Sequence, residues 1–240
     1  LRNLAGIAED GHLKPVYGID LAGDLTEHTV ESLPGYRGMG PVRRGNQAHE
    51  HLQHDVYGQV VLSAAQAFFD MRILRPMRES DYLMLEAVAD KAFESYDQPD
   101  ASLWELRTKS RVHTYSSVMC WAACDRMAKI ARHLGKSDRW SHWLERASII
   151  KKKVYAEAFN SEIGSFTSAF GGEEIDASLL QLAPLGFVEG SDPRYIGTVA
   201  AIERELLHDG HVFRYVAADD FGKPRNAFNV CTFWYIEALH

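Results

Sequence analysis

Apolar residues recur with the period of an α-helix along most of this 240-residue chain, and no other feature constrains the fold as strongly. One apolar face consists of Val60, Ala64, Ala67, Phe68 and Met71. Its steps of four, three, one and three match the 3.6-residue period of a helix, not the two-residue period of a strand. The pattern predicts a long helix that starts after Gly45 and, with its repetition elsewhere, an all-α fold.

The same apolar period predicts helices over most of the remaining chain. Long helices are expected over 120–134, 143–158 and 192–206, with shorter ones over 80–96, 176–182 and 226–240. Gly135 can end one of them in a left-handed cap, and Ser137 and Asp138 are capping candidates for the next. Asp192 followed by a proline is typical of a helix start. Well over half of the residues are therefore predicted to be helical.

The connections between these helices alternate in length. Short turns such as 133–138 contrast with long polar or glycine-rich loops over 33–46, 97–111 and 209–226. If helical hairpins pack side by side around a ring, short turns gather on one rim, and the long loops on the other rim can build a site. No linker or repeat marks a second domain, and one domain is expected for a chain of this size.

Charge and composition exclude several classes of function. The chain has 26 basic and 33 acidic residues, a net charge of -7, and no long basic run that could neutralise a polyphosphate backbone. No apolar stretch approaches the roughly 20 residues needed to cross a bilayer. Neither nucleic acid nor a membrane is an expected partner. Cys120, Cys124 and Cys231 are predicted to be buried thiols, which fits a reducing, cytoplasmic compartment.

The 11 histidines raise the question of a metal site, especially in the segment His-Glu-His-Leu-Gln-His-Asp over 49–55. A zinc-binding helix of the His-Glu-x-x-His type needs its second histidine where Gln53 stands. No metal is therefore expected. His51 and Asp55, four residues apart, are predicted to pair on a helix surface. For Gln53 and Asp55, buried hydrogen bonding between helices is favoured over a place in a binding site.

Glu105 is the strongest candidate for a catalytic residue. It lies between Trp104 and Leu106 in a polar loop that precedes a predicted helix. Apolar neighbours remove water from a carboxyl and favour its protonated form, which can protonate a leaving group. On the local residues alone, the alternative is an ion pair of Glu105 with Arg107 or Arg111 on a solvated loop.

Five segments, in the right order, resemble glycoside hydrolase family 15, which contains the glucoamylases and their bacterial relatives. The Leu-Trp-Glu triplet at 103–105 is similar to the motif that carries the family's proton donor. The segment 33–59 resembles a loop with Gly-Tyr-Arg, Pro-Val-Arg and Gly-Asn that leads into a helix. Three further segments resemble later parts of the family pattern: 174–187, 192–202 and 213–234. Together these segments cover most of the chain.

This resemblance implies an α/α toroid of the six-hairpin type and an inverting, exo-acting hydrolase that releases glucose from α-glucosides. Glu105 would be the general acid, and a second carboxylate would activate water on the opposite face of the sugar. The substrate would be an oligosaccharide or disaccharide. No metal or organic cofactor is implied, because two carboxyls suffice. The alternatives are a trehalase of the same family and a non-catalytic carbohydrate-binding or regulatory paralogue.

The predicted sugar-binding residues are Trp104, Arg214, Phe228, Arg43, Arg107 and Asp176. Trp104 is expected either to face a sugar ring or to pack in the core. Arg214 matches the Arg of the family's Arg-Tyr motif and can donate to sugar hydroxyls, whereas Arg43 and Arg107 are favoured to pin loops to carboxylates. Phe228 stands where many relatives have Trp, which keeps an apolar platform without an indole donor. Asp176 is predicted to cap a helix and is a further candidate for lining the site.

Two parts of the family pattern are absent from the sequence. The family's general base lies beyond the last helix predicted here, and a Trp and an Arg-Asp pair that grip the sugar precede the first. We therefore expect residues 1–240 to form part of one catalytic α/α toroid domain, incomplete at both its N-terminal and C-terminal sides. The sequence does not specify an oligomeric state.

Overall fold

A computed structural model describes residues 12–22, 24–70, 72, 77–219 and 222–240 of the chain. The α-helices found there are α2 (Asp55–Phe69), α3 (Glu79–Ser95), α4 (Thr114–His133), α5 (Ser137–Ala158), α6 (Pro193–Leu206) and α7 (Asn229–Ala238). Short 3-10 helices are η1 (Tyr36–Gly38), η2 (Gln47–Glu50) and η3 (Ala177–Leu182). The predicted all-α class is confirmed. About half of the described residues are helical, fewer than predicted, because the long loops take up the remainder.

The strands are two residues each and form three antiparallel pairs. These pairs are β1 (His28–Thr29) with β2 (Arg43–Arg44), β3 (Phe159–Asn160) with β4 (Ser165–Phe166), and β5 (Leu207–His208) with β6 (His211–Val212). Each pair is a local hairpin that does not extend into a larger sheet within the described residues. The strands therefore shape loops and do not form a layer of the fold.

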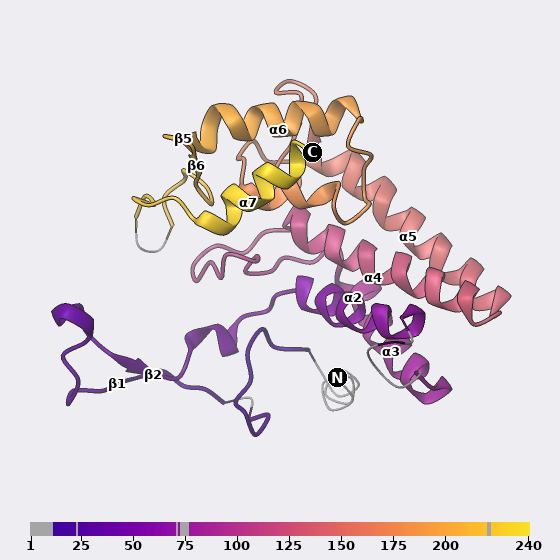
Figure 1. The fold of residues 1–240 in the computed structure, drawn as a ribbon, viewed down its shortest axis with the longest axis horizontal. Helices are drawn as coiled ribbons and strands as arrows, with labels where there is room; N and C mark the ends of the chain where they lie inside the picture. Colours follow the sequence, from indigo (N-terminus) through magenta and orange to yellow (C-terminus); the bar gives the residue numbers. More distant parts are fainter. Residues whose placement is uncertain (1–11, 23, 71, 73–76, 220–221) are drawn as a thin grey trace.

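Helix α4 lies at the centre of the helical body, with α2 and α3 on one side and α5 on another (Figure 1). Every residue of α4 from Thr114 to Cys124 is buried. A helix that is buried all round must be covered on every face, and here α2, α3, α5 and η3 supply that cover. Helices α6 and α7 pack beyond it, against η3. The result is a succession of helices packed side by side.

Glycine allows α2 and α4 to touch backbone to backbone. A Cβ atom added to Gly58 of α2 would overlap the carbonyl oxygen of Met119 in α4, at a separation that real Cβ contacts do not reach. The contact brings Gln59 to α4, where its Nε2 donates to the hydroxyl of Tyr115 at 3.2 Å. Gly58 therefore sets the distance between two helices and the position of the polar residues beside it.

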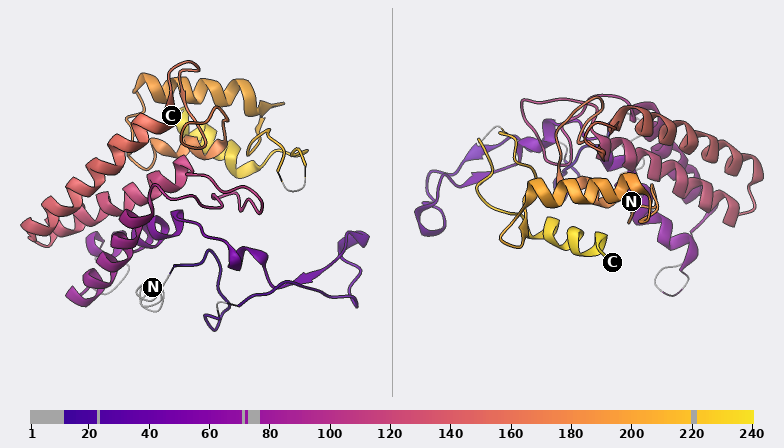
Figure 2. Two further views of the ribbon diagram at one scale, coloured as in Figure 1. Left: turned by 180° about the vertical axis from the view of Figure 1, so that it is seen from behind. Right: turned by 90° about the horizontal axis from the view of Figure 1, so that it is seen from above.

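The long loops lie on the same side of the molecule in all views (Figures 1 and 2). Lys109 Nζ, in the 97–111 loop, donates to the carbonyl oxygen of Ala218, in the 209–226 loop, at 2.7 Å. The β1–β2 hairpin projects away from the helical body on this side, whereas the short turn between α4 and α5 lies at the opposite end (Figure 1). This is the arrangement expected from the alternation of loop lengths.

Two predicted helix starts and one predicted helix type differ from the structure. The long helix begins at Asp55 and not after Gly45, because the Asn46 side chain accepts from the Ala48 amide at 2.9 Å and starts only the short η2. Helix α5 begins at Ser137, with Lys136 as its N-cap and no side-chain capping bond. The 177–182 segment is a 3-10 helix and not an α-helix. Met71, predicted on the apolar face of α2, lies outside the described residues.

Other local predictions are confirmed. Gly135 has a φ of 73° after α4, as a left-handed cap requires. Asp192 accepts from the Arg194 amide at 2.9 Å at the start of α6, where Pro193 is the first residue. All three cysteines are buried and free. Among the helices that the structure describes, none is long and apolar enough to cross a membrane.

Replacing Gly58 with Ala in the full-length protein should destabilise it by about 1–3 kcal/mol, because the added methyl group would meet the α4 backbone. Gly190→Ala is the matched control, since a methyl group added there would have no neighbour within 4 Å, and it should change stability by less than about 0.5 kcal/mol. Denaturant unfolding measures both variants. Equal stability of the two would contradict the close contact between α2 and α4.

Candidate active site

The loop that carries Glu105 contains two residues with left-handed backbone angles. Ser102 has a φ of 66° and Glu105 a φ of 57°, which is uncommon for residues other than glycine. Backbone hydrogen bonds hold this turn: the Glu105 amide donates to Ser102 at 3.1 Å, and the Leu106 amide donates to Ala101 at 2.8 Å. The turn directs the side chains of Trp104 and Glu105 into different cavities.

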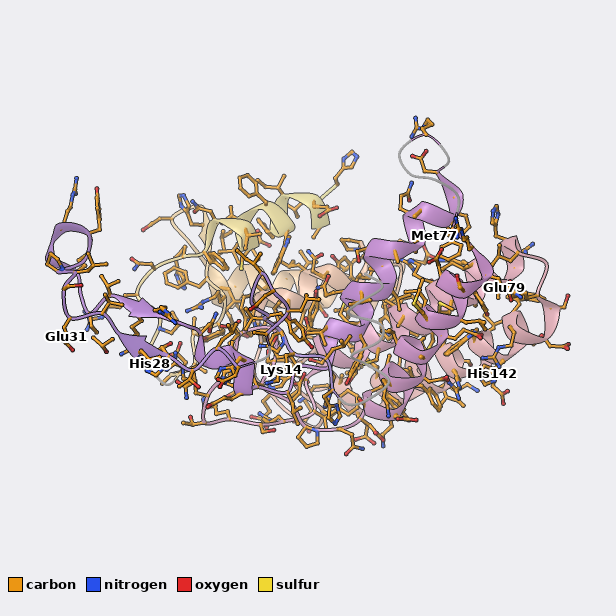
Figure 3. All side chains as sticks on the ribbon, turned by 90° about the horizontal axis from the view of Figure 1, so that it is seen from below. Lys14, His28, Glu31, Met77, Glu79 and His142 are labelled. Atoms are coloured by element: carbon orange, nitrogen blue, oxygen red, sulfur yellow. The ribbon has the colours of Figure 1, made fainter. Side chains whose placement is uncertain are left out.

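Glu105 lines a cavity of about 330 Å³, which we call the Glu105 cavity. Its other polar lining residues are Lys14, Tyr17, Gln53, Asp55 and Gln59, and its apolar walls include Leu103, Val56 and Val60. The volume falls in the range of about 300–1,000 Å³ that is usual for small-molecule sites. Figure 3 shows Lys14 midway along the molecule, between the β1 hairpin with His28 and Glu31 at one end and Glu79 and His142 at the other.

Two buried side chains of this cavity have unpaired polar atoms. Asp55 is 3% exposed and Gln53 is 6% exposed. Within the described part of the chain, Asp55 Oδ1 and Gln53 Nε2 have no hydrogen-bond partner. Buried polar atoms without a partner are rare and unfavourable. Both atoms are shielded from a water-sized probe, so they do not face the interior of the cavity.

Burial raises the pKa of Asp55 to about 7, and the negative charges of Asp100 and Glu105 act in the same direction. Hydrogen bonds from a backbone amide and from Gln59 oppose the rise. The Asp55 carboxyl is therefore neutral over much of the range below pH 7. A carboxyl that holds its proton near neutral pH is a donor as well as an acceptor.

Asp100 joins the start of α2, the Glu105 loop and α4. Its Oδ2 accepts from the His54 amide at 2.8 Å and from the Ser116 hydroxyl at 2.6 Å, and its Oδ1 accepts from the Ser102 amide at 3.1 Å. Asp100 is itself 1% exposed. This buried carboxylate fixes the loop that presents Glu105 against the helix that presents Asp55.

Trp104 points away from the Glu105 cavity. Its indole Nε1 donates to Asp176 Oδ2 at 3.0 Å, and its ring packs against Tyr215 and Trp234, with centroid separations of 5.9 and 6.2 Å. The expectation that apolar neighbours remove water from Glu105 is wrong, because Glu105 is exposed and Trp104 does not line its cavity. Contact of Trp104 with sugar stays a prediction.

Asp176 caps η3, as predicted, by accepting from the Ser178 amide at 2.9 Å. Burial is the largest influence on this carboxyl and raises its pKa, whereas hydrogen bonds from Ser178 and Trp104 oppose the rise. Asp176 and Trp104 line a second cavity of about 50 Å³, together with Tyr215. Asp176 thus holds the Glu105 loop to η3 from the side opposite Asp100.

Arg214 and Phe228 lie together at the 209–226 loop. The guanidinium carbon of Arg214 is 5.3 Å from the Tyr215 ring centre and 6.0 Å from that of Phe228, and Phe228 is 47% exposed. The Arg214 carbonyl accepts from the Ala177 amide at 2.8 Å. Tyr215 links this pair to Trp104. Arg214 therefore belongs to the Trp104 side of the loop and does not line the Glu105 cavity.

The other arginines hold loops. Arg43 pairs with Glu27 within the β1–β2 hairpin, the pinning that was favoured for it. This hydrogen bond lowers the pKa of Glu27, and the more distant charge of Arg107 adds to the effect. Arg111 pairs with Glu174 at 3.5 Å. Of the salt bridges found in the described residues, none includes Glu105, so the predicted alternative of an ion pair with Arg107 or Arg111 is not observed.

Sequence reasoning favoured a buried role for Asp55, which its burial confirms, and missed Gln59 as a cavity residue. The predicted surface pair of His51 and Asp55 was wrong, because α2 begins at Asp55 and this residue is buried. A usable signal was present: Asp55 and Gln59 are four apart, beside a glycine that permits close helix contact. In the part of the chain that is described, no group of three or more His, Cys, Asp or Glu side chains is arranged to hold a metal ion.

Comparison with known proteins finds a matching sequence family and named relatives. The sequence profile described as Glycosyl hydrolases family 15 matches residues 2–240. A trehalase from Thermoplasma volcanium is 38% identical over 97% of this chain, and one from Mycobacterium tuberculosis is 34% identical over 95%. These matches cover 37% and 33% of the two relatives, so the chain spans little more than a third of their length.

Solved structures agree on the fold. A glycosidase in complex with glucose superposes with a TM-score of 0.65 at 24% identity, covering 86% of this chain and 55% of the other. A bacterial glucoamylase complexed with acarbose gives 0.55 at 14% identity, covering 84% and 37%. At such identities the likeness concerns the fold alone. The packed helices belong to an α/α toroid, and the described residues form part of it.

Trp104→Phe in the full-length protein should lower the free energy of unfolding by about 1–3 kcal/mol, because the buried Asp176 carboxyl loses a donor. Trp140→Phe is the control: Trp140 is 36% exposed, and its loss should matter by less than about 0.5 kcal/mol. Denaturant unfolding distinguishes the two. A Trp104 variant as stable as the control would show that the indole does not anchor the loop.

Asp55→Asn should change how stability depends on pH. Because the folded pKa of Asp55 is raised from 3.8 to about 7, the folded state keeps a proton that the unfolded state releases between these two values. Wild-type stability should therefore fall from pH 4 to pH 8 relative to the variant, by up to about 4 kcal/mol. Unfolding at both pH values measures this. Exposed Asp138→Asn should follow the wild type, and a parallel course for Asp55→Asn would refute the shift.

Proposed function

The chain belongs to glycosyl hydrolases family 15, and we propose that its full-length protein is an inverting glycoside hydrolase that cleaves trehalose with Glu105 as the general acid. The observation that supports this most directly is the position of Glu105. Glu105 is exposed and lines a cavity of about 330 Å³ together with the polar residues Lys14, Tyr17 and Gln59. Such a cavity can bind a compact polyhydroxylated ligand beside an acid.

In the proposed reaction, Glu105 protonates the oxygen of the glycosidic bond as that bond breaks. A second carboxylate, about 6.5–9.5 Å away, removes a proton from a water molecule that attacks the opposite face of the sugar. The transition state resembles an oxocarbenium ion, and inversion gives a β-configured glucose. The backbone turn and the Asp100 and Asp176 anchors hold Glu105 in place, which supports proton transfer to a fixed position.

We prefer trehalose as the proposed substrate because the relatives found by sequence comparison are trehalases. Trehalases from Thermoplasma, Mycobacterium and Sulfolobus are 30–38% identical to this chain over more than nine-tenths of its length. The release of glucose from α-glucans, expected first from the sequence, is the second candidate. The bacterial glucoamylase supports this second candidate only through a similar fold, at 14% sequence identity. A non-catalytic carbohydrate-binding paralogue is the third possibility and predicts binding without turnover.

A panel of trehalose, maltose, maltodextrins and isomaltose, assayed with full-length protein for release of glucose, decides between these substrates. We expect trehalose to give the highest kcat/KM. Preference for maltodextrins would support the glucoamylase-like function instead. Binding of a sugar without release of glucose would support the non-catalytic alternative.

Glu105→Gln should reduce kcat on trehalose by at least about 10²–10⁴-fold with little change in KM, because the side chain keeps its size but cannot supply a proton. α-Glucosyl fluoride should be affected much less, since its leaving group needs no proton. Glu145→Gln, an exposed residue of α5, is the control and should keep normal kinetics. Normal turnover of trehalose by the Glu105 variant would mean that another group is the acid.

A further inference from the structure

Gln59 is the exposed polar residue that α2 presents to the Glu105 cavity. Val56, Gln59 and Val60 have the spacing of neighbours on one face of a helix, and all three line the cavity. The two valines are half-buried, whereas Gln59 is exposed. Glu105 reaches the same cavity from the 97–111 loop. The proposed acid therefore shares its cavity with a helix face that offers one amide between two apolar side chains.

Hydrogen bonds to other residues determine which atom of the Gln59 amide is left for a ligand. Its Nε2 donates to the hydroxyl of Tyr115, a buried residue of α4, at 3.2 Å. The Asp55 carboxyl accepts a second hydrogen bond from the Gln59 side chain. A side-chain amide has two N–H donors and one carbonyl acceptor, so these two bonds use both of its donors. The carbonyl oxygen Oε1 remains as an acceptor.

The packing of α2 on α4 fixes the position of this amide. Gly58, next to Gln59, approaches the backbone of Met119 in α4 so closely that a Cβ atom would not fit between them. Tyr115, one turn before Met119, is 7% exposed and is held by the core around it. A side chain that is already immobilised loses little conformational entropy when a ligand binds. Gln59 is thus a pre-positioned hydrogen-bond acceptor.

We propose that Gln59 is a substrate-binding residue whose Oε1 accepts a hydrogen bond from one hydroxyl of the glucose unit in the Glu105 cavity. This inference rests on the proposed function and adds a specificity-determining contact to it. An acceptor at a fixed position discriminates against a sugar that lacks the matching hydroxyl. Val56 and Val60 contact the C–H groups of the same ring. Tyr115 is a positioning residue, because it acts on the sugar only through the Gln59 amide.

Calorimetric titration of the full-length protein with glucose, and with deoxyglucoses that each lack one hydroxyl, tests the inference. Gln59→Met keeps the length of the side chain but removes the amide, so it should weaken glucose binding by about 3–10-fold, the effect of one hydrogen bond. One deoxyglucose should bind the wild type more weakly than glucose by a similar factor, and Gln59→Met should weaken it no further. The remaining deoxyglucoses should be weakened by the substitution as much as glucose is.

Gln66→Met is the matched control, because Gln66 is an exposed residue of the same helix that does not line the Glu105 cavity. It should bind every sugar as the wild type does. Two results would overturn the inference. One is unchanged glucose affinity in Gln59→Met. The other is an equal loss for glucose and for every deoxyglucose, because Gln59 would then only join α2 to α4. Denaturant unfolding establishes that each variant is folded.

Tyr115→Phe tests how the amide is held. The substitution removes the hydroxyl that accepts from Gln59 Nε2, and it should weaken glucose binding by about 2–5-fold because the amide is no longer fixed. Adding Tyr115→Phe to Gln59→Met should cause no further loss, since both changes remove the same contact. Additive losses would overturn the positioning role of Tyr115.

Release of glucose from trehalose and maltose by the wild type separates this inference from the proposed function. If neither sugar is cleaved while the deoxyglucoses give the expected pattern, the proposed function fails and the contact of Gln59 with glucose stands. If trehalose is cleaved while Gln59→Met binds every sugar as the wild type does, the proposed function stands and only the inference about Gln59 fails.

Discussion

The backbone contact between α2 and α4 at Gly58 is the constraint on which the rest of the site depends. Because no side chain separates the helices there, Gln59 reaches Tyr115, and Asp55, one turn earlier, is buried where α2 begins. The His54 amide and the Ser116 hydroxyl then share the Asp100 carboxylate. A wider spacing of the helices would expose Asp55 to water and separate the groups that set its protonation.

Glu105 is positioned by its backbone and its neighbours, with no salt bridge of its own in the described chain. The left-handed residues Ser102 and Glu105 turn the loop so that consecutive side chains serve different purposes. Trp104 anchors the loop to Asp176 and the aromatic cluster, whereas Glu105 faces the larger cavity. An acid held in this way can approach a leaving group without first breaking an ion pair.

The two carboxyls of the Glu105 cavity differ in exposure: Glu105 is exposed, whereas Asp55 is buried and its pKa is raised by that burial. Asp55 Oδ1 and Gln53 Nε2 are shielded from the interior of the cavity, whereas Gln59 is exposed to it. Family membership supports Glu105 as the proposed acid, and the trehalase relatives support trehalose as the proposed substrate.

Sequence periodicity determined the helical class, the cap at Gly135, the start of α6 and the cap at Asp176, because these depend on residues within one turn of each other. The resemblance to the family motif also made Glu105 the candidate acid, which stays a prediction. Tertiary structure alone decided where α2 starts, where Trp104 points and that Asp55 is buried. Burial of Asp55 requires the 97–111 loop and α4, which are about fifty residues away in the chain, and no local pattern records such a contact. The orientation of Trp104 likewise depends on Asp176 and Tyr215, which join the loop only in the folded protein.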